Sequence, residues 1–275
     1  MRLSPRHPRY RSLRVRERLA KAHRTGVVVP EGLIAHGRGE AFDYLLGERT
    51  SPSARRAERA AAEWLLAARR PVVSVNGNVA ALAAPEVARL ATAVPGLAVE
   101  VNLFHRTGPR ARAIARRLEE AGVRRVLGVH PTARIPGLPS DRARVDRDGI
   151  YRSDVCLVPL EDGDRAGALR AVGKRVISID LNPLSRTSLT ADLPIVDELS
   201  RALGTIAREA RRLRRSGRKA RLLPFDADGA LASALVTIDR RLMRAAARRP
   251  RRARPRARAW RPRSRGTTGR TRRRP

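Results

Sequence analysis

The stretch 180–187 combines side chains that could bind a nucleotide. It reads Asp-Leu-Asn-Pro-Leu-Ser-Arg-Thr and follows an apolar run that predicts a strand. Asp180 could accept hydrogen bonds from ribose hydroxyls, and Asn182 could read the edge of a base or a sugar. Arg186 and Thr187 could bind phosphate, because a guanidinium offers a planar fork of donors. These residue types at this spacing indicate nucleotide binding.

Three further polar clusters follow predicted strands, at 76–78, 102–107 and 159–165. Ligands of open α/β sheets bind beyond the carboxyl ends of the strands, so four such loops on one rim predict a site. Each cluster taken alone is also explained by the preference of Asn, Asp, Gly and Pro for turns.

Metal binding and covalent catalysis have less support. The carboxylates within 161–164 could bind Mg²⁺ or could cap the helix that follows, and the two interpretations have equal weight. His36 precedes Gly-Arg-Gly, where Arg38 could hold an anion or be a solvated surface charge. The histidines lack metal-ligand spacing, and the P-loop pattern does not fit at 167–175. Cys156 lies in an apolar run, so we expect it in the core.

The elements that must position these loops alternate between apolar strands and helical patterns. We predict strands at 72–75, 98–102, 126–129, 155–159, 176–180 and 193–196. Helical spacing with glycine stops predicts helices at 110–121 and 163–172. Such alternation is typical of parallel strands with crossover helices, so we expect an α/β fold with a Rossmann-like parallel sheet, flanked by helices, over 70–210.

The regions on either side of the sheet are predicted to be helical. Residues 1–66 form an N-terminal helical segment in which 32–38 is a loop or short strand. Helices at 211–245 complete a single α/β domain over 1–245. The remaining stretch, 246–275, is rich in Arg, Pro and Gly, and it cannot bury enough apolar area to offset its ordering entropy. We expect a disordered basic C-terminal tail.

The net charge of +34 is unevenly distributed, since residues 240–275 contain 17 arginines and no acid. Such charge is typical of nucleic-acid binding, yet aromatic residues make up only 3% and no binding motif is present. The tail could contact nucleic acid nonspecifically, act as a solubilising extension, or reflect a shifted reading frame. No apolar run reaches the ~20 residues of a membrane span. The start has no apolar signal region, so we expect a cytoplasmic protein.

Seven strings of residues, in collinear order, resemble archaeal phosphopantothenate synthetases, which are also called 4-phosphopantoate–β-alanine ligases. The longest are GLIAHGRGEAFDYLLGE at 32–48, SVNGNVAAL at 74–82 and IDLNPLSRT at 179–187. The others are HPRYRSLRVRE at 7–17, VNLF at 101–104, IPGL at 135–138 and VPLEDGDR at 158–165. The resemblance covers about 7–245.

The resemblance implies a homodimer with a Rossmann-like fold that condenses 4-phosphopantoate with β-alanine at the expense of ATP. The products would be 4′-phosphopantothenate, AMP and diphosphate, in coenzyme A biosynthesis, and we expect Mg²⁺ to accompany ATP. The implied ATP-binding positions are Arg16, Arg38, Asp180, Leu181, Asn182, Arg186, Thr187, Glu198 and Leu199. The residues expected to bind the other substrates are His36, Asn76, Asn78, Arg106 and Asp162.

Two positions depart from the pattern of that family, which often has Asn where Glu198 stands and Tyr where His105 stands. A carboxylate only accepts hydrogen bonds, so a donor contact of the side chain at 198 is lost, while a backbone contact could survive. The alternatives are a basic nucleic-acid-binding protein and another nucleotide-dependent enzyme, such as a small-molecule kinase. The catalytic base and the metal ligands stay open.

Overall fold

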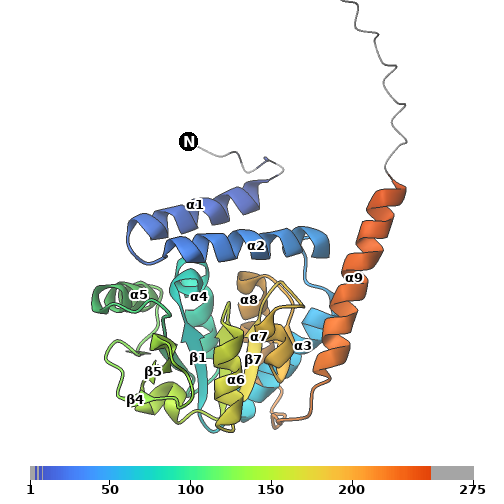
Figure 1. Cartoon of the computed structure of the whole chain (residues 1–275). Helices are drawn as coiled ribbons and strands as arrows, with labels where there is room; N and C mark the ends of the chain where they lie inside the picture. Colours follow the sequence, from blue (N-terminus) through green and yellow to red (C-terminus); the bar gives the residue numbers. More distant parts are fainter. Residues whose placement is uncertain (1–3, 5, 8, 249–275) are drawn as a thin grey trace, which may run out of the picture.

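The computed structural model describes residues 4, 6–7 and 9–248 (Figure 1). Its main sheet consists of β1 (Pro71–Val75), β2 (Ala98–Val101), β3 (Val126–Leu127), β6 (Val155–Pro159), β7 (Arg175–Ile179) and β8 (Leu193–Ile195). The spatial order is β3-β2-β1-β6-β7-β8, and every neighbouring pair is parallel. The predicted Rossmann-like α/β fold is confirmed. The strand order reverses between β1 and β6, the point at which ligands bind in doubly wound sheets.

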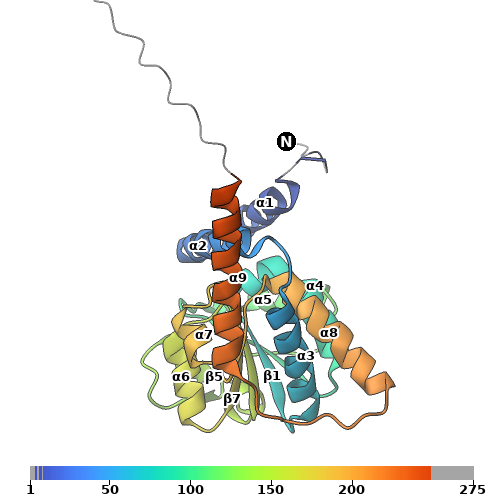
Figure 2. The same cartoon turned by 90° about the vertical axis from the view of Figure 1, so that its right-hand side faces the viewer.

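Helices cover both faces of the sheet, which explains why its strands are almost continuously apolar. One face carries α3 (Pro52–Ala67), α4 (Gly77–Ala93), α5 (Gly108–Glu120) and α8 (Leu199–Arg215). The other face carries α6 (Gly163–Ala171) and α7 (Arg186–Thr190). Figure 2 shows α6 and α7 on one side of the strands, and α3, α4 and α8 on the other.

A small irregular region extends the second face beside β2. It comprises β4 (Ala133–Arg134), η1 (Asp141–Ala143), β5 (Arg144–Val145) and η2 (Arg147–Tyr151). The two short strands pair antiparallel to each other. Buried Glu100 on β2 holds this region to the sheet, since its two carboxylate oxygens accept from Asp146 N at 2.9 Å and Ile150 N at 2.6 Å.

Two N-terminal helices cross the carboxyl ends of the strands, namely α1 (Tyr10–Arg24) and α2 (Pro30–Leu46) (Figure 1). The prediction of a loop or short strand at 32–38 is wrong, because α2 covers these residues. Pro30 and Glu31 favour a helix start here. Gly32 then allows a close approach to α4, since a Cβ there would lie 2.5 Å from Asn78 Oδ1. Tertiary packing therefore outweighs the low helix propensity of the three glycines.

The last helix, α9 (Ala227–Ala247), connects α2 to the sheet. It begins at Ala227 because Asp226 caps it, accepting from Gly229 N at 2.8 Å, so the residues 216–226 of the predicted helical region 211–245 lie between α8 and α9. A separate apolar cluster joins α2, the ends of β7 and β8, and α9, and it contains Phe42, Leu46, Leu181, Val196, Leu231, Ala234 and Ile238. This cluster seats α2 on the rim of the sheet. Of the predicted tail at 246–275, Ala246 and Ala247 belong to α9, so the expectation is wrong for these two residues, and 249–275 lie outside the described residues.

None of the described helices combines the length and the apolar composition that crossing a membrane requires.

Candidate active site

The carboxyl end of β7 places the predicted nucleotide loop on the rim of the sheet. Asp180 Oδ1 accepts from Asn182 N at 2.9 Å, and Asn182 Oδ1 accepts from Leu184 N at 2.9 Å. Burial raises the pKa of the Asp180 carboxyl overall, although the hydrogen bonds from Asn182 and Ser185 and the charge of Arg38 act in the opposite direction. Phe42 and Leu46 of α2 pack with Leu181 of this loop, so α2 and the β7 loop face each other.

The start of α8 forms the neighbouring part of the rim, and it explains how Glu198 is accommodated. The Glu198 carboxylate caps the helix, accepting from Ser200 N at 3.0 Å and from Arg201 N at 3.0 Å. Its side chain is therefore engaged with backbone N–H groups. Leu199 and Leu181 have buried side chains, so both would contact a nucleotide through their backbone.

Helices α1 and α2 supply a polar cluster above this rim. Arg16 Nη2 lies 2.8 Å from Glu40 Oε2, and the Tyr44 hydroxyl donates to Glu40 Oε1 at 2.9 Å. Burial alone would raise the pKa of the Glu40 carboxyl, but the hydrogen bonds from Arg16 and Tyr44 lower it overall. Glu40 is thus an ionised partner that orients the Arg16 guanidinium.

His36 lies one turn before Glu40 on α2. Burial lowers the pKa of its imidazole, while the charges of Glu40 and Glu198 act in the opposite direction. Its Nε2 atom is buried and has no hydrogen-bond partner among the described residues. Unpartnered buried polar atoms are rare in folded proteins, and such an atom is expected where a ligand or a water binds. The surroundings of His36 therefore fit a ligand-binding role.

The predicted phosphate-binding pair, Arg186 and Thr187, begins α7 and divides into two environments. The Arg186 side chain is 84% exposed and lies 3.7 Å from Asp164 Oδ1. The Thr187 side chain is buried, and its hydroxyl donates to the Glu161 carbonyl. Arg186 can approach a phosphate from solvent, whereas the Thr187 hydroxyl joins α7 to the end of β6.

Asn76 and Asn78 lie at the switch point between β1 and β6, with their side chains bonded to backbone. Asn76 Oδ1 accepts from Val79 N at 3.0 Å, and its Nδ2 donates to the Leu160 carbonyl at 2.8 Å. Asn78 Nδ2 donates to the Gly32 carbonyl of α2 at 2.8 Å. Both side chains position the rim, and their contact with a substrate stays a prediction.

The remaining predicted substrate residues lie on the β2 and β6 side of the rim. Arg106 Nη2 donates to the Val129 carbonyl at 2.8 Å, while its Nη1 is buried without a partner among the described residues. Burial lowers the pKa of this guanidinium. Asp162 Oδ2 accepts from Arg142 Nε at 3.1 Å and is about half exposed.

A buried ionic cluster beneath the β6 loop was not predicted from the sequence. Glu161 accepts from Arg142 Nη1 at 3.0 Å and also pairs with Arg165, which donates to Ser74 Oγ at 2.8 Å. Two guanidiniums therefore occupy the Glu161 carboxylate and leave Asp162 and Asp164 as the accessible carboxylates of this loop. No group of three His, Cys, Asp or Glu residues in the described part of the chain could hold a metal ion. The i, i+4 spacing of Glu161 and Arg165 was the available signal.

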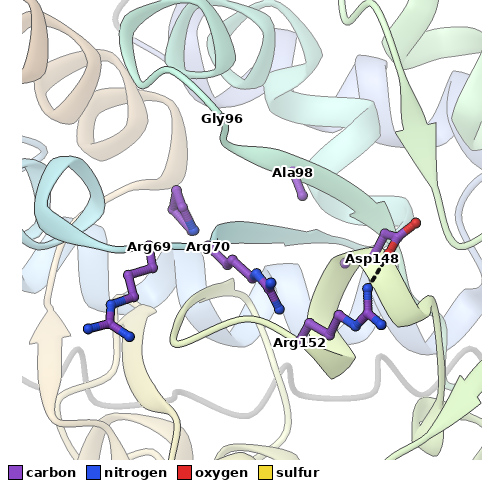
Figure 3. Close-up of a pocket in the computed structure, with 8 residues that line it drawn as sticks. Arg69, Arg70, Gly96, Ala98, Asp148 and Arg152 are labelled. Atoms are coloured by element: carbon purple, nitrogen blue, oxygen red, sulfur yellow. Dashed lines mark hydrogen bonds and ion pairs between the residues drawn. The ribbon is translucent and has the colours of Figure 1, made fainter.

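A cavity of about 230 Å³ lies far from this chemistry, at the amino ends of the strands (Figure 3). Arg69, Arg70, Arg152 and Asp148 line it, together with Gly96. None of the predicted site residues contributes to this cavity, so we assign the candidate site to the carboxyl rim on the strength of its side-chain chemistry.

Comparison with known proteins agrees with the rim chemistry. A sequence profile of the family described as "Phosphopantothenate/pantothenate synthetase" matches residues 53–241. A relative from Methanospirillum hungatei is 58% identical over 74% of this chain and 82% of its own length. One from Methanosarcina mazei is 50% identical over 88% and 96%, and one from Thermococcus kodakarensis is 48% identical over 87% and 93%. All three are named "4-phosphopantoate--beta-alanine ligase". The chain belongs to the phosphopantothenate/pantothenate synthetase family.

Proposed function

We propose that the chain condenses 4-phosphopantoate with β-alanine at the expense of ATP, giving 4′-phosphopantothenate, AMP and diphosphate in coenzyme A synthesis. The names of the relatives support this reaction. The structural observation that carries it is the position of α2 over the carboxyl rim of β7 and β8, where Phe42 and Leu46 pack with Leu181 and Val196 and Asp43 pairs with Arg201 of α8.

ATP is proposed to bind between α2 and the rim. Asp180 would accept from the ribose hydroxyls, and Asn182 would contact the base or the sugar. Arg16, Arg38 and Arg186 would neutralise the phosphates, since charge-assisted hydrogen bonds from guanidinium are strong and planar. The carboxylate of Glu198 repels phosphate, so the triphosphate would run toward the arginines.

The chemistry requires activation, because a carboxylate is a poor electrophile. The phosphopantoate carboxylate would attack the α-phosphorus of ATP, and diphosphate would leave. The amine of β-alanine would then attack the acyl carbon, lose a proton and displace AMP. The arginines of the rim would stabilise charge that develops on phosphate oxygens in both steps, and they need no reorganisation to do so.

Binding of 4-phosphopantoate is proposed on the β1–β2 side of the rim. Arg106 has a buried Nη1 atom without a partner among the described residues, which fits a phosphate contact. The backbone contacts of Asn76 and Asn78 shape this part of the rim, and Asp162 and His36 lie at its edges. Thr187 would act by joining α7 to the β6 loop.

Mg²⁺ is proposed to enter with ATP, held chiefly by phosphate oxygens. Magnesium commonly binds through one or two protein carboxylates together with substrate phosphates. Asp162 and Asp164 are the accessible carboxylates nearest Arg186, with side chains 54% and 79% exposed. They fit that role, whereas Glu161 does not, because its carboxylate is buried and paired with two guanidiniums.

The cytoplasmic location stays a prediction from the sequence.

A homodimer is proposed, with a second copy of the chain covering the exposed apolar residues of α2 and α9. Ile34 is 65% exposed, Leu242 50% and Met243 65%. Figure 2 shows α9 extending well beyond the sheet. Projecting apolar residues of this kind are typical of an interface between subunits. The molar mass of the full chain from light scattering tests this proposal, and a monomer at micromolar concentration would contradict it.

The reaction is tested by nucleotide product analysis with the full chain. AMP and diphosphate should form only when both 4-phosphopantoate and β-alanine are present. Release of ADP would indicate a kinase, and nucleotide turnover without β-alanine would contradict the proposed condensation.

A further inference from the structure

One guanidinium joins α2 to the body of the enzyme. Arg201, in the first turn of α8, forms a bidentate pair with Asp43 of α2, with distances of 3.1 Å to Oδ2 and 2.5 Å to Oδ1. The same guanidinium contacts Asp197 Oδ1 through Nε at 3.0 Å and through Nη2 at 2.7 Å. A planar fork that engages two carboxylates restrains both position and angle.

Asp197 links this contact to the nucleotide rim. Its side chain is buried, and its Oδ1 also accepts from Glu198 N at 2.8 Å. The Thr50 hydroxyl, in the connection between α2 and α3, donates to Asp197 Oδ2 at 2.6 Å. A continuous series of polar contacts therefore runs from α2 through Arg201 and Asp197 to the start of α8.

The position of Asp43 on α2 determines which side chains move if its ion pair with Arg201 is broken. His36, Glu40 and Asp43 follow each other at i, i+4 and i+7, so they lie on one face of the helix. That face carries the buried ring nitrogen of His36 and the carboxylate that orients Arg16. A rotation of α2 that displaced Asp43 would displace these groups together.

The apolar contacts of α2 do not replace such a restraint. Phe42 and Leu46 pack against Leu181 and Val196. Burial of apolar area is non-directional, so it holds the helix against the rim without setting its rotation. The bidentate ion pair adds a directional contact in the second half of α2, beside the hydrogen bond that Asn78 donates to the Gly32 carbonyl in the first turn.

We propose that Asp43, Arg201 and Asp197 form a clamp that sets the rotation of α2 over the rim and thereby positions Glu40, and through it Arg16, for ATP binding. Asp43 and Arg201 are positioning residues in this scheme. The inference rests on the proposed function for its ligand, ATP, while the clamp itself is a property of the fold.

The test uses Asp43→Ala in the full chain. This substitution breaks the α2 half of the clamp and leaves Arg201 paired with Asp197, so the buried carboxylate keeps its partner. Glu209→Ala is the matched control, because Glu209 is 17% exposed, like Asp43 at 15%, and pairs with Arg212 at 2.8 Å. Its second partner, Arg59, lies on α3, so the control ion pair does not touch α2.

Two measurements are needed. The KM for ATP should rise at least tenfold in Asp43→Ala and stay within twofold in Glu209→Ala, while the kcat of both variants changes less than the KM. Hydrogen exchange of the 30–46 peptides should be faster in Asp43→Ala alone. An ATP KM in Asp43→Ala that matches the control, or unchanged exchange of α2, would overturn the clamp.

These readouts separate the clamp from the proposed reaction. If the wild type releases no AMP with both substrates, the proposed reaction fails, and faster exchange of α2 in Asp43→Ala still supports the clamp. If the wild type is active and the two variants behave alike, the clamp fails and the proposed reaction stands.

Discussion

Glu58→Gln should make the protein more stable at neutral pH, because the wild-type carboxyl is held in its uncharged form. Glu58 of α3 is fully buried, and neither of its oxygens has a donor among the described residues. Burial, followed by the charge of Asp197 beside it, raises the pKa of this carboxyl from 4.5 to about 9. Arg55 on α3 and Arg208 on α8 act in the opposite direction and do not offset the burial.

The direction in which Glu58 changes the stability with pH depends on whether the folded or the unfolded state binds the proton more tightly. The folded protein keeps the proton up to about pH 9, whereas an unfolded chain releases it near pH 4.5. The stability contribution of Glu58 is therefore fully present below pH 4.5, and it is lost as the pH rises toward 9. The loss amounts to about 1.4 kcal/mol for each pH unit between these limits.

The magnitude at pH 7 is an upper value of about 3 kcal/mol, because pH 7 lies about 2.5 pH units above the pKa of an exposed glutamate. Glutamine does not titrate, and its amide can donate to Asp197 as the protonated carboxyl does. Exchanging a hydrogen bond from O–H for one from N–H offsets about 1 kcal/mol of the gain. We expect the free energy of unfolding to increase by about 2 kcal/mol at pH 7.

The assay is urea denaturation of the wild type and the variant at pH 5.5, 7 and 8. The gain should grow with pH, since the wild-type stability falls more steeply than that of the variant. Glu63→Gln on the same helix is the control, because Glu63 is only partly buried, and its stability profile should parallel the wild type. Parallel profiles for Glu58→Gln and the wild type would refute the reasoning, because they would mean that Glu58 is ionised in the folded protein.

Three further substitutions test other parts of the structure. Arg106→Ala should raise the KM for 4-phosphopantoate several-fold more than the KM for ATP, and equal effects in steady-state kinetics would remove its assignment. Glu198→Asn should lower the KM for ATP about threefold, since it removes a negative charge and Asn is a favoured cap; an unchanged or higher KM would contradict this. Glu100→Gln should cost about 2 kcal/mol in urea denaturation, because an amide has one acceptor oxygen for two buried N–H groups. A loss below 0.5 kcal/mol, roughly the scatter of surface substitutions, would oppose that account.

The strands and the β7 loop could be predicted from the sequence because their signals are local. Runs of Val and Ile between polar turns marked the strands to within about two residues, and the alternation with helices implied the parallel order. Asp180 and Asn182 were singled out as candidates because they stand at the end of such a run. Helix α2 was missed over 32–38, since Gly32 is explained only by its packing against Asn78, which belongs to another element, and Gly37 has no such neighbour.

The clamp could not be predicted from the sequence, because it too depends on contacts between residues that are far apart along the chain. Arg201 and Asp43 are 158 positions apart, and Thr50 and Asp197 are 147 apart. A single ion pair between distant helices produces no repeating pattern in either sequence segment. Each of its charged residues, taken alone, is indistinguishable from a solvated surface residue. Only the folded arrangement shows that Asp197 has several partners.

Glu198 places a carboxylate where the family often has Asn, close to the proposed ATP site. The surroundings of Glu198 reduce the repulsion that this carboxylate would exert on ATP. An additional carboxylate near a triphosphate would normally weaken binding. Here the carboxylate accepts two backbone N–H groups at the start of a helix of 17 residues, where the helix dipole favours negative charge. Much of its field is therefore compensated before ATP arrives, which is why we expect only about a threefold penalty. The carboxylate of Glu40 is compensated by its ion pair with Arg16 and by the hydrogen bond from Tyr44. Arg186 adds positive charge at the rim: its side chain is 84% exposed and its ion pair with Asp164 spans 3.7 Å, so the guanidinium can turn toward an incoming nucleotide.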